Sequence, residues 1–190
     1  MPPNRSKRSA NGFTLIEVLI AVALLVTMSI GVAQLFAIGV AAERASRDRT
    51  VAAILAAAKI EQMRALTWSY ERSSRVPRSD QTTDLSVDPE ATGGPGLQDS
   101  PPGTLDRTVP PWVDYLDARA RWVGTGTGLP RNAVFIRRWA VRRLPADPDR
   151  SLVVSVFVTT VAREARRRTP GILWTGEDAL LTTIVSRKAQ

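Results

Sequence analysis

The chain has 190 residues, a formal net charge of +8, 26 basic and 18 acidic side chains, and neither cysteine nor histidine. The lack of cysteine excludes disulfides and thiolate metal sites, and the lack of histidine excludes Ser-His and Cys-His catalysis and most zinc sites. Lysine occurs only at positions 7, 59 and 188, which leaves few candidates for a Ser-Lys dyad. We therefore expect no enzyme, no cofactor, no metal site and no small-molecule substrate.

A short basic leader, residues 1–12, stands ahead of a long apolar segment. The leader carries Arg5, Lys7 and Arg8 and no acidic residue, and the 25 residues from Val18 to Ala42 carry no charge. A helix needs roughly 20 apolar residues to cross a bilayer. The pattern therefore predicts a membrane-spanning helix close to the N-terminus.

Glu17 is the acidic residue at the start of this apolar segment. A carboxylate within a membrane segment costs about 2.5–3.5 kcal/mol on insertion scales, so it indicates a functional role with a charged partner. Alternatively, Glu17 lies at the interface, one turn into the helix, where a negative charge interacts favourably with the helix dipole. The residues alone leave both interpretations open.

A cleavable secretory signal peptide is the competing explanation of the N-terminus. Such a peptide has an apolar core of about 7–15 residues followed by a small-residue cleavage site. Here the apolar segment is longer and continues into a polar helix with no cluster of proline or glycine after Ala42. A permanently anchored single-pass protein is the better alternative. Basic residues flank the segment on both sides, so the positive-inside rule leaves its orientation open.

The block Gly12-Phe13-Thr14-Leu15-Ile16-Glu17, between the basic leader and the apolar segment, resembles the N-terminus of the type IV pilin family, with its pseudopilin and minor-pilin branches. In that family a prepilin peptidase cuts after the glycine, here Gly12, and methylates the new terminal amine, here that of Phe13. The resemblance implies that Glu17 pairs with the N-terminal amine of a neighbouring pilin or pseudopilin subunit. It also implies a leader in the cytoplasm, an anchor in the inner membrane and a C-terminal domain outside.

A long helix without proline is predicted from Phe13 onward, with an assembly half at 13–42 and an amphipathic half at 43–72. Residues at three- and four-residue steps form one moderately apolar face of the second half: Val51, Ile54, Leu55, Ala58, Gln62, Met63 and Leu66. Residues 59–66 are similar to the corresponding helix of PilV-type minor pilins and of I-type pseudopilins of type II secretion. Gln34 stands where many pilins have a proline that bends the helix.

The rest of the chain predicts a connection followed by a sheet. Residues 73–111 are rich in proline and glycine and lack periodicity, which favours a long mobile connection with little burial and at most a short hairpin near Thr83. Residues 112–190 predict a small antiparallel sheet, with strands at 112–116, 120–123, 133–143, 152–161 and 179–186. The fold class is therefore α+β: a long N-terminal helix, half of it transmembrane, packed on a C-terminal antiparallel sheet, as in pilins.

Three weaker motifs have ordinary structural explanations. The glycine-rich segment 124–128 is followed by Pro130 and no helix, so we interpret it as a flexible turn. Asp114 and Asp117 are interpreted as residues of a solvated turn rather than as cation ligands. Arginines cluster in residues 112–190, together with tryptophans, as some nucleic-acid-binding surfaces do. Adjacent arginines on a strand point to opposite faces, however, so we favour a solvated basic surface.

These observations predict a minor pilin or pseudopilin, a structural subunit of a type IV pilus or a type II secretion pseudopilus. The prepilin peptidase, other pilin subunits and the inner membrane are the expected partners. Two alternatives remain: a DNA-binding minor pilin of a competence filament, and a membrane-anchored protein that never enters a filament.

Overall fold

The computed structural model describes residues 13–70, 77–166 and 178–189. It divides into two compact units, one ending at Arg44 and the other beginning at Ala45. Helix α1, Leu15–Ala65, contributes residues to both. Its sequence is rich in alanine and leucine, which are strong helix formers, and contains no proline. The helix therefore forms as the sequence predicts, but the core of the protein lies entirely in the second unit.

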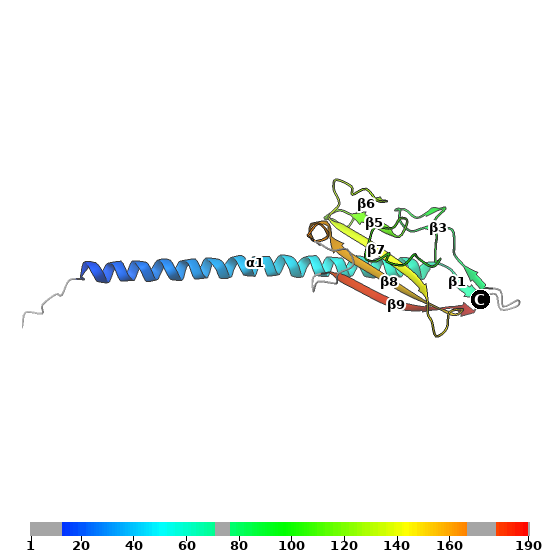
Figure 1. Cartoon of the computed structure of the whole chain (residues 1–190), viewed down its shortest axis with the longest axis horizontal. Coiled ribbons are helices and arrows are strands. Elements are labelled where there is room, and N and C mark those ends of the chain that lie inside the picture. The colour runs from blue at the N-terminus through cyan, green and yellow to red at the C-terminus, as the bar shows by residue number, and fades with distance from the viewer. Residues whose placement is uncertain (1–12, 71–76, 167–177, 190) are drawn as a thin grey trace, which may run out of the picture. The chain divides into compact units, whose positions relative to one another are not determined.

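The second unit is built on a five-stranded antiparallel sheet with the strand order β6-β5-β7-β8-β9. The strands are β5 (Val113–Leu116), β6 (Trp122–Thr125), β7 (Phe135–Arg143), β8 (Ser151–Thr160) and β9 (Ala179–Ser186). A one-turn helix, α2 (Val161–Glu164), follows β8. The predicted α+β fold, a long N-terminal helix with a C-terminal antiparallel sheet, is confirmed (Figure 1).

One face of this sheet packs against the second half of α1. Successive side chains of a strand point to opposite faces, so every second residue of β7 and β8 lies on the helix side. The sheet residues buried on this side include Trp139, Val141, Leu152, Val154, Val156 and Val158. A smaller cluster, Val113, Tyr115 and Ile136, forms on the opposite face. The continuous apolar sequence of β8 is explained by burial on both faces.

The buried face of α1 differs from the predicted one. The buried residues are Ala52, Leu55, Ala56, Lys59, Ile60 and Met63. Leu55 and Met63 were expected there, but Ile54 is 63% exposed and Ala58 is also exposed. The predicted face did not include Lys59, whereas the helix is turned so that Lys59 enters the core. The two alanines lie beside it on the same face.

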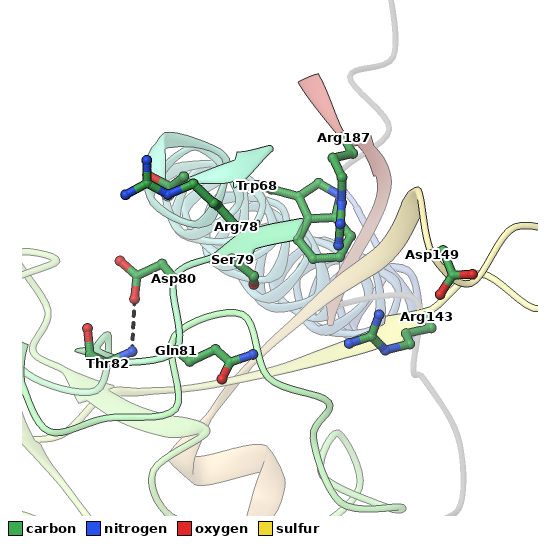
Figure 2. A pocket seen from close by; sticks show the side chains of 10 residues that line it. Trp68, Arg78, Ser79, Asp80, Gln81, Thr82, Arg143, Asp149 and Arg187 are labelled. Atoms are coloured by element: carbon green, nitrogen blue, oxygen red, sulfur yellow. Dashed lines mark hydrogen bonds between the residues drawn. The ribbon is translucent and has the colours of Figure 1, made fainter. Parts of the chain in front are cut away.

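A second, three-stranded sheet follows the end of α1 and was not predicted. We expected the helix to continue to residue 72, but it ends at Ala65, and Trp68–Tyr70 form strand β1. Strand β1 pairs with β2 (Pro77–Ser79) in the antiparallel direction and with β10 (Lys188–Ala189) in the parallel direction. The Arg187 guanidinium lies 3.9 Å from the centroid of the Trp68 ring (Figure 2). The predicted last turns of the helix are thus replaced by a strand that pairs with the nearby β2 and the distant β10.

The described part of the connecting segment is more buried than predicted. A short hairpin forms between β3 (Thr83–Asp84) and β4 (Ala91–Thr92), close to the expected position. Leu85 and Leu97 are buried in the main core, contrary to the expectation of little burial. A Cβ atom at Gly94 would lie 2.2 Å from the Asp84 Cα, so only glycine fits where these strands approach closely. Isolated leucines between tight turns carry no periodicity, which is why sequence patterns missed them.

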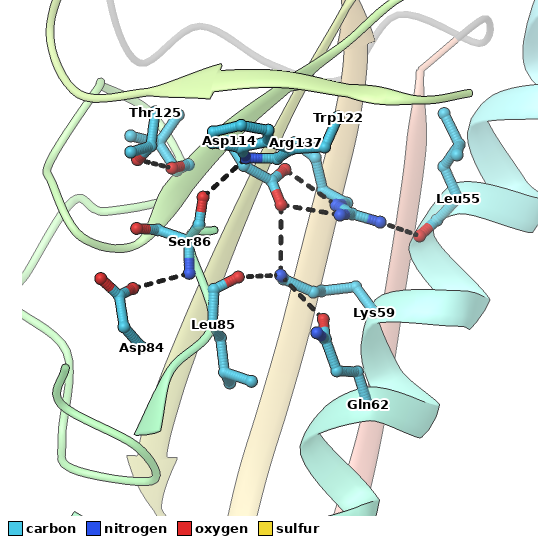
Figure 3. A network of polar contacts seen from close by, with 11 residues as sticks. Leu55, Lys59, Gln62, Asp84, Leu85, Ser86, Asp114, Trp122, Thr125 and Arg137 are labelled. Atoms are coloured by element: carbon cyan, nitrogen blue, oxygen red, sulfur yellow. Dashed lines mark hydrogen bonds and ion pairs between the residues drawn. The ribbon is translucent and has the colours of Figure 1, made fainter. Parts of the chain in front are cut away.

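A buried polar cluster joins α1 to the sheet and to this segment (Figure 3). Arg137 of β7 lies opposite Asp114 of β5 and donates two hydrogen bonds to its carboxylate, from Nε to Oδ1 (2.9 Å) and from Nη2 to Oδ2 (2.7 Å). Lys59 of α1 donates to the same Oδ2 atom (3.1 Å), to Gln62 Oε1 (2.9 Å) and to the Leu85 carbonyl. A single carboxylate is thus shared by two cations from two different elements.

Burial and proximity explain the electrostatics of this cluster. Lys59 and Asp114 are each only 1% exposed, so the interpretation of Asp114 as a solvated turn residue is wrong. Burial lowers the pKa of Lys59 to about 8, the nearby Asp114 carboxylate opposes this shift, and the Arg137 charge adds to it. The Lys59 ammonium also lies 4.1 Å from the centroid of the Trp139 ring, which favours the cation. Arg137 completes the cluster by donating to the Leu55 carbonyl at 3.2 Å.

Asp114→Ala is expected to destabilise the protein by about 3–5 kcal/mol, because it leaves two buried cations without their counter-ion. Urea unfolding of the full chain in detergent micelles, followed by tryptophan fluorescence, measures this change. Asp99→Ala is the matched control, since Asp99 forms an exposed pair with Arg143 and its loss should cost less than about 0.5 kcal/mol. Equal losses in both variants would show that the cluster does not hold the helix to the sheet.

The lowered pKa of Lys59 predicts a pH dependence of stability with a defined sign. Between about pH 8 and 10.5 the unfolded chain holds a proton on Lys59 that the folded chain has lost. The free energy of unfolding should therefore rise with pH across this window. The measurement compares urea midpoints of the parent and of Lys59→Met at pH 7.5 and 10. The parent should gain stability relative to the variant, and parallel pH profiles would contradict the prediction.

Candidate functional site

The first candidate site is the segment that opens helix α1. Phe13 precedes the helix and is 85% exposed. Thr14 lies between Phe13 and the first helical residue, and Glu17 lies in the first turn. Gly12 lies outside the described residues, so the structure does not place the predicted cleavage site. It does bring Thr14 and Glu17 together.

These two residues cap the helix. The Thr14 backbone N–H donates to Glu17 Oε2 at 3.3 Å, and the Glu17 backbone N–H donates to the Thr14 hydroxyl at 3.4 Å. A threonine and a glutamate three residues apart form a capping box, in which each side chain satisfies a backbone donor that lacks a helical partner. The Glu17 charge also lies at the positive end of the helix dipole. The Glu17 side chain is exposed, so an ammonium of another molecule has access to its carboxylate.

The apolar part of α1 that follows has no covering partner among the described residues of its own unit. Its large side chains, from Leu15 to Val40, are all at least 47% exposed. A stripe of this size is not stable in water and indicates contact with lipid or with other chains. α1 is long and apolar enough to cross a membrane.

Two hydroxyl-bearing residues within this apolar part are compatible with hydrocarbon surroundings. The Thr27 hydroxyl donates to the Ala23 carbonyl at 2.8 Å, and the Ser29 hydroxyl donates to the Leu25 carbonyl at 2.7 Å. A lipid environment requires that polar groups be satisfied within the helix, and both hydroxyls meet this requirement. Gly31 and Gly39 face open space, so a neighbouring helix can approach the backbone at these positions.

The Lys59 cluster is the second candidate site, because a buried lysine with a lowered pKa is often catalytic. Sequence analysis named Lys59 only as a remote candidate for a Ser-Lys dyad and did not connect it with Asp114 or Arg137. Among the described residues, the hydrogen bonds of its ammonium go to Gln62, Leu85 and Asp114, and none goes to a serine hydroxyl. The ammonium is enclosed in the core, so the geometry favours a structural role. One sequence feature could have indicated that Lys59 is buried: it is a single cation at helical spacing from Ala52, Ala56 and Met63, which places it on their face of the helix.

The arginine clusters do not form one solvated surface. Arg137 and Arg138 point to opposite faces of the sheet, as the strand pattern predicts, but both are buried, which corrects the expectation of solvation. Arg138 Nη2 donates to Glu164 Oε1 at 2.6 Å, which ties β7 to α2. Arg142 and Arg143 are exposed, and part of the cluster at 166–168 lies outside the described residues. Only the exposed members remain available to a ligand.

Comparison with known proteins gives one match. A family model described as the prokaryotic N-terminal methylation motif matches residues 7–33, which include the Gly12–Glu17 block and the first part of the apolar helix. No curated protein and no solved structure matches the chain. The match supports a type IV pilin-like class III signal peptide. Together with the single long apolar helix near the N-terminus, it indicates a membrane-anchored, single-pass protein and a type IV pilin-like or pseudopilin precursor.

Proposed function

We propose that this protein is a minor pilin or pseudopilin, a structural subunit that is processed at the inner membrane and assembled into a pilus or pseudopilus. One observation carries the proposal: a methylation motif at residues 7–33 leads directly into a helix whose apolar side chains are exposed. A leader of this kind implies processing by a prepilin peptidase and assembly with other pilin subunits. The C-terminal domain lies outside the cytoplasm in this proposal.

Processing removes residues 1–12 and leaves Phe13 at the new N-terminus. The peptidase cuts after Gly12 and methylates the amine of Phe13, and neither step needs a catalytic group of this chain. Phe13 is exposed and precedes the first helical turn, which is an accessible position for both reactions. The chain is thus a substrate of the peptidase and a building block, with no enzymatic activity of its own.

Assembly then covers the exposed half of α1. In the membrane this half contacts lipid, and in a filament it contacts the same half of neighbouring subunits. Such head-to-tail contacts use two different surfaces of each subunit and propagate into a helical fibre. The exposed Glu17 carboxylate pairs with the Phe13 amine of a neighbour, which sets the axial position of one subunit against the next. The similarity of residues 59–66 to PilV-type minor pilins and I-type pseudopilins supports a minor subunit.

The role in processing predicts that Gly12→Val blocks cleavage. The peptidase needs a small residue before the cut, so the variant should retain its full 190-residue chain, while the parent should begin at N-methylated Phe13. Intact-mass measurement of protein extracted from the membranes of a host with its prepilin peptidase distinguishes the two. A parent chain that still carries Met1 would contradict the proposal.

The role in assembly predicts that Glu17→Val inserts into the membrane and is cleaved, but enters filaments at least about tenfold less, because a buried ammonium of the neighbour loses its charged partner. Glu17→Gln should restore only part of the loss. Thr14→Ala is the matched control, since it weakens the capping contact and keeps the carboxylate. The amount of protein in the sheared filament fraction measures each effect.

Two outcomes would contradict a pairing role for Glu17. Normal release of Glu17→Val into the filament fraction would mean that the carboxylate has no part in assembly. An equal loss in Thr14→Ala, with cleavage intact, would mean that Glu17 acts by capping its own helix and not by pairing with a neighbour.

A further inference from the structure

An open pocket of about 820 Å³ lies in the second unit (Figure 2). The pocket lies where the beginning of β1 meets the ends of β2 and β7. The turn after β7 and the residue between β9 and β10 also line it. Its walls are polar except for Trp68. Three arginines contribute to it: Arg78, Arg143 and Arg187.

Arg187 lies along the Trp68 ring, as Figure 2 shows, with its guanidinium carbon 3.9 Å from the ring centroid. This stacking holds the planar group in one orientation and uses its face, not its edge of N–H donors. Arg187 Nε is shielded from solvent and has no hydrogen-bond partner among the described residues. A buried donor without an acceptor is unfavourable, so an acceptor that reached it would be bound favourably.

Arg143 adds a second positive charge to the same pocket. Its guanidinium carbon lies 6.0 Å from the Trp68 ring centroid. It donates to Asp99 at 3.3 Å and to the Pro148 carbonyl at 3.2 Å, but the pair with Asp99 is solvent-exposed and therefore weak. Burial lowers the pKa of Arg187, the charge of Arg143 lowers it further, and Asp149 opposes both. An anion between the two arginines would relieve this repulsion.

The acidic residues of the pocket limit the kind of anion that fits. Asp80 accepts hydrogen bonds from the backbone N–H groups of Thr82 and Thr83, both at 3.0 Å, so its carboxylate serves its own turn. Asp80 and Asp149 would repel a second or third negative charge of a polyanion. Arg187 already covers the Trp68 ring, which removes the face on which a nucleic-acid base would stack. These features favour a single anionic group over a nucleic-acid strand.

We propose that this pocket binds the carboxylate of a polypeptide, an Asp or Glu side chain or a chain terminus of a partner protein, through the guanidinium groups of Arg187 and Arg143. A carboxylate matches the planar fork of an arginine and accepts two hydrogen bonds from it. Ser79, Gln81 and Thr82 line the same pocket and offer polar contacts to the flanking peptide backbone. The proposal goes beyond the assembly role, because every lining residue lies between Thr67 and Arg187 and none belongs to the methylation motif.

The test titrates the full-length chain in detergent micelles with the singly charged acidic peptide acetyl-Gly-Glu-Gly-Gly-amide by isothermal calorimetry. Its uncharged twin, acetyl-Gly-Gln-Gly-Gly-amide, should bind at least about tenfold more weakly, because it lacks the charge-assisted hydrogen bonds. Arg187→Gln and Arg143→Gln should each weaken binding of the acidic peptide by about tenfold or more. Arg187→Lys should recover only part of the affinity, since an ammonium keeps the charge but not the fork.

Arg131→Gln is the control variant, because Arg131 is exposed and lies outside the pocket. It removes the same charge and should leave the affinity within about twofold of the parent. Two Arg variants are used because Arg187 stacks on Trp68 and its loss changes local packing; far-UV circular dichroism checks that each variant is folded.

Three results would overturn the proposal. One is the absence of peptide binding by the parent chain. Another is binding that survives in both Arg187→Gln and Arg143→Gln. The third is binding of a ten-nucleotide oligothymidylate through the same arginines without binding of the acidic peptide. That result would assign the pocket to phosphodiesters.

Discussion

The shared carboxylate of Asp114 is the interaction on which the second unit depends. It accepts hydrogen bonds from Arg137 on the adjacent strand and from Lys59 on the helix. Taking three charges out of water is costly, and a cluster of this kind is stable only if every charge is paired and every donor is satisfied. Lys59 reaches this state through Gln62 and Leu85 in addition to Asp114. The cluster therefore favours one orientation of the helix against the sheet, because a rotated helix would leave these buried charges unpaired.

The same helix meets two different environments. Beyond Ala45 its inner face is covered by the sheet and by the cluster, so that half needs no other partner. Before Arg44 its large apolar side chains are exposed, and no described residue of its own unit covers them. Burial of apolar surface is favourable by roughly 25 cal/mol per Å², so this half is stable only in lipid or against other chains. A subunit that is first held in a membrane and then packed into a filament would place this apolar half in lipid first and against other chains afterwards.

Local patterns predicted the features that depend on neighbouring residues. The Gly12–Glu17 block, the uncharged segment after it and the strands of the main sheet are all visible as short motifs or periodicities. The second strand of the β5–β6 hairpin begins two residues further along the chain than predicted, because Ala120 adopts a positive φ of 63° and extends the turn. Boundaries of this kind depend on turn geometry that composition does not specify.

Features that depend on distant partners were missed. Lysine and aspartate are almost never fully buried unless they are paired, so a pattern places Lys59 and Asp114 on the surface until the partner is known. Strand β1 pairs with the remote β10 as well as with the nearby β2, and nothing within residues 68–70 signals a parallel neighbour at 188–189. Leu85 and Leu97 are single apolar residues within turns, and their burial follows only from the position of α1 and the sheet. The Trp68–Arg187 stack depends on the same long-range pairing.

The proposal that neighbouring subunits cover the exposed half of α1 is directly measurable, because the chain has no native cysteine. Single cysteines placed at Leu19 and Leu35 can be oxidised in sheared filaments and compared with one placed at the exposed Ala118 in the second unit. We predict that the cysteines at the two helix positions form disulfide-linked adducts with a pilin subunit that carries a matching cysteine, and that the control forms few. Cysteines at Leu19 and Leu35 that remain monomeric, with the chain confined to the membrane fraction, would contradict it.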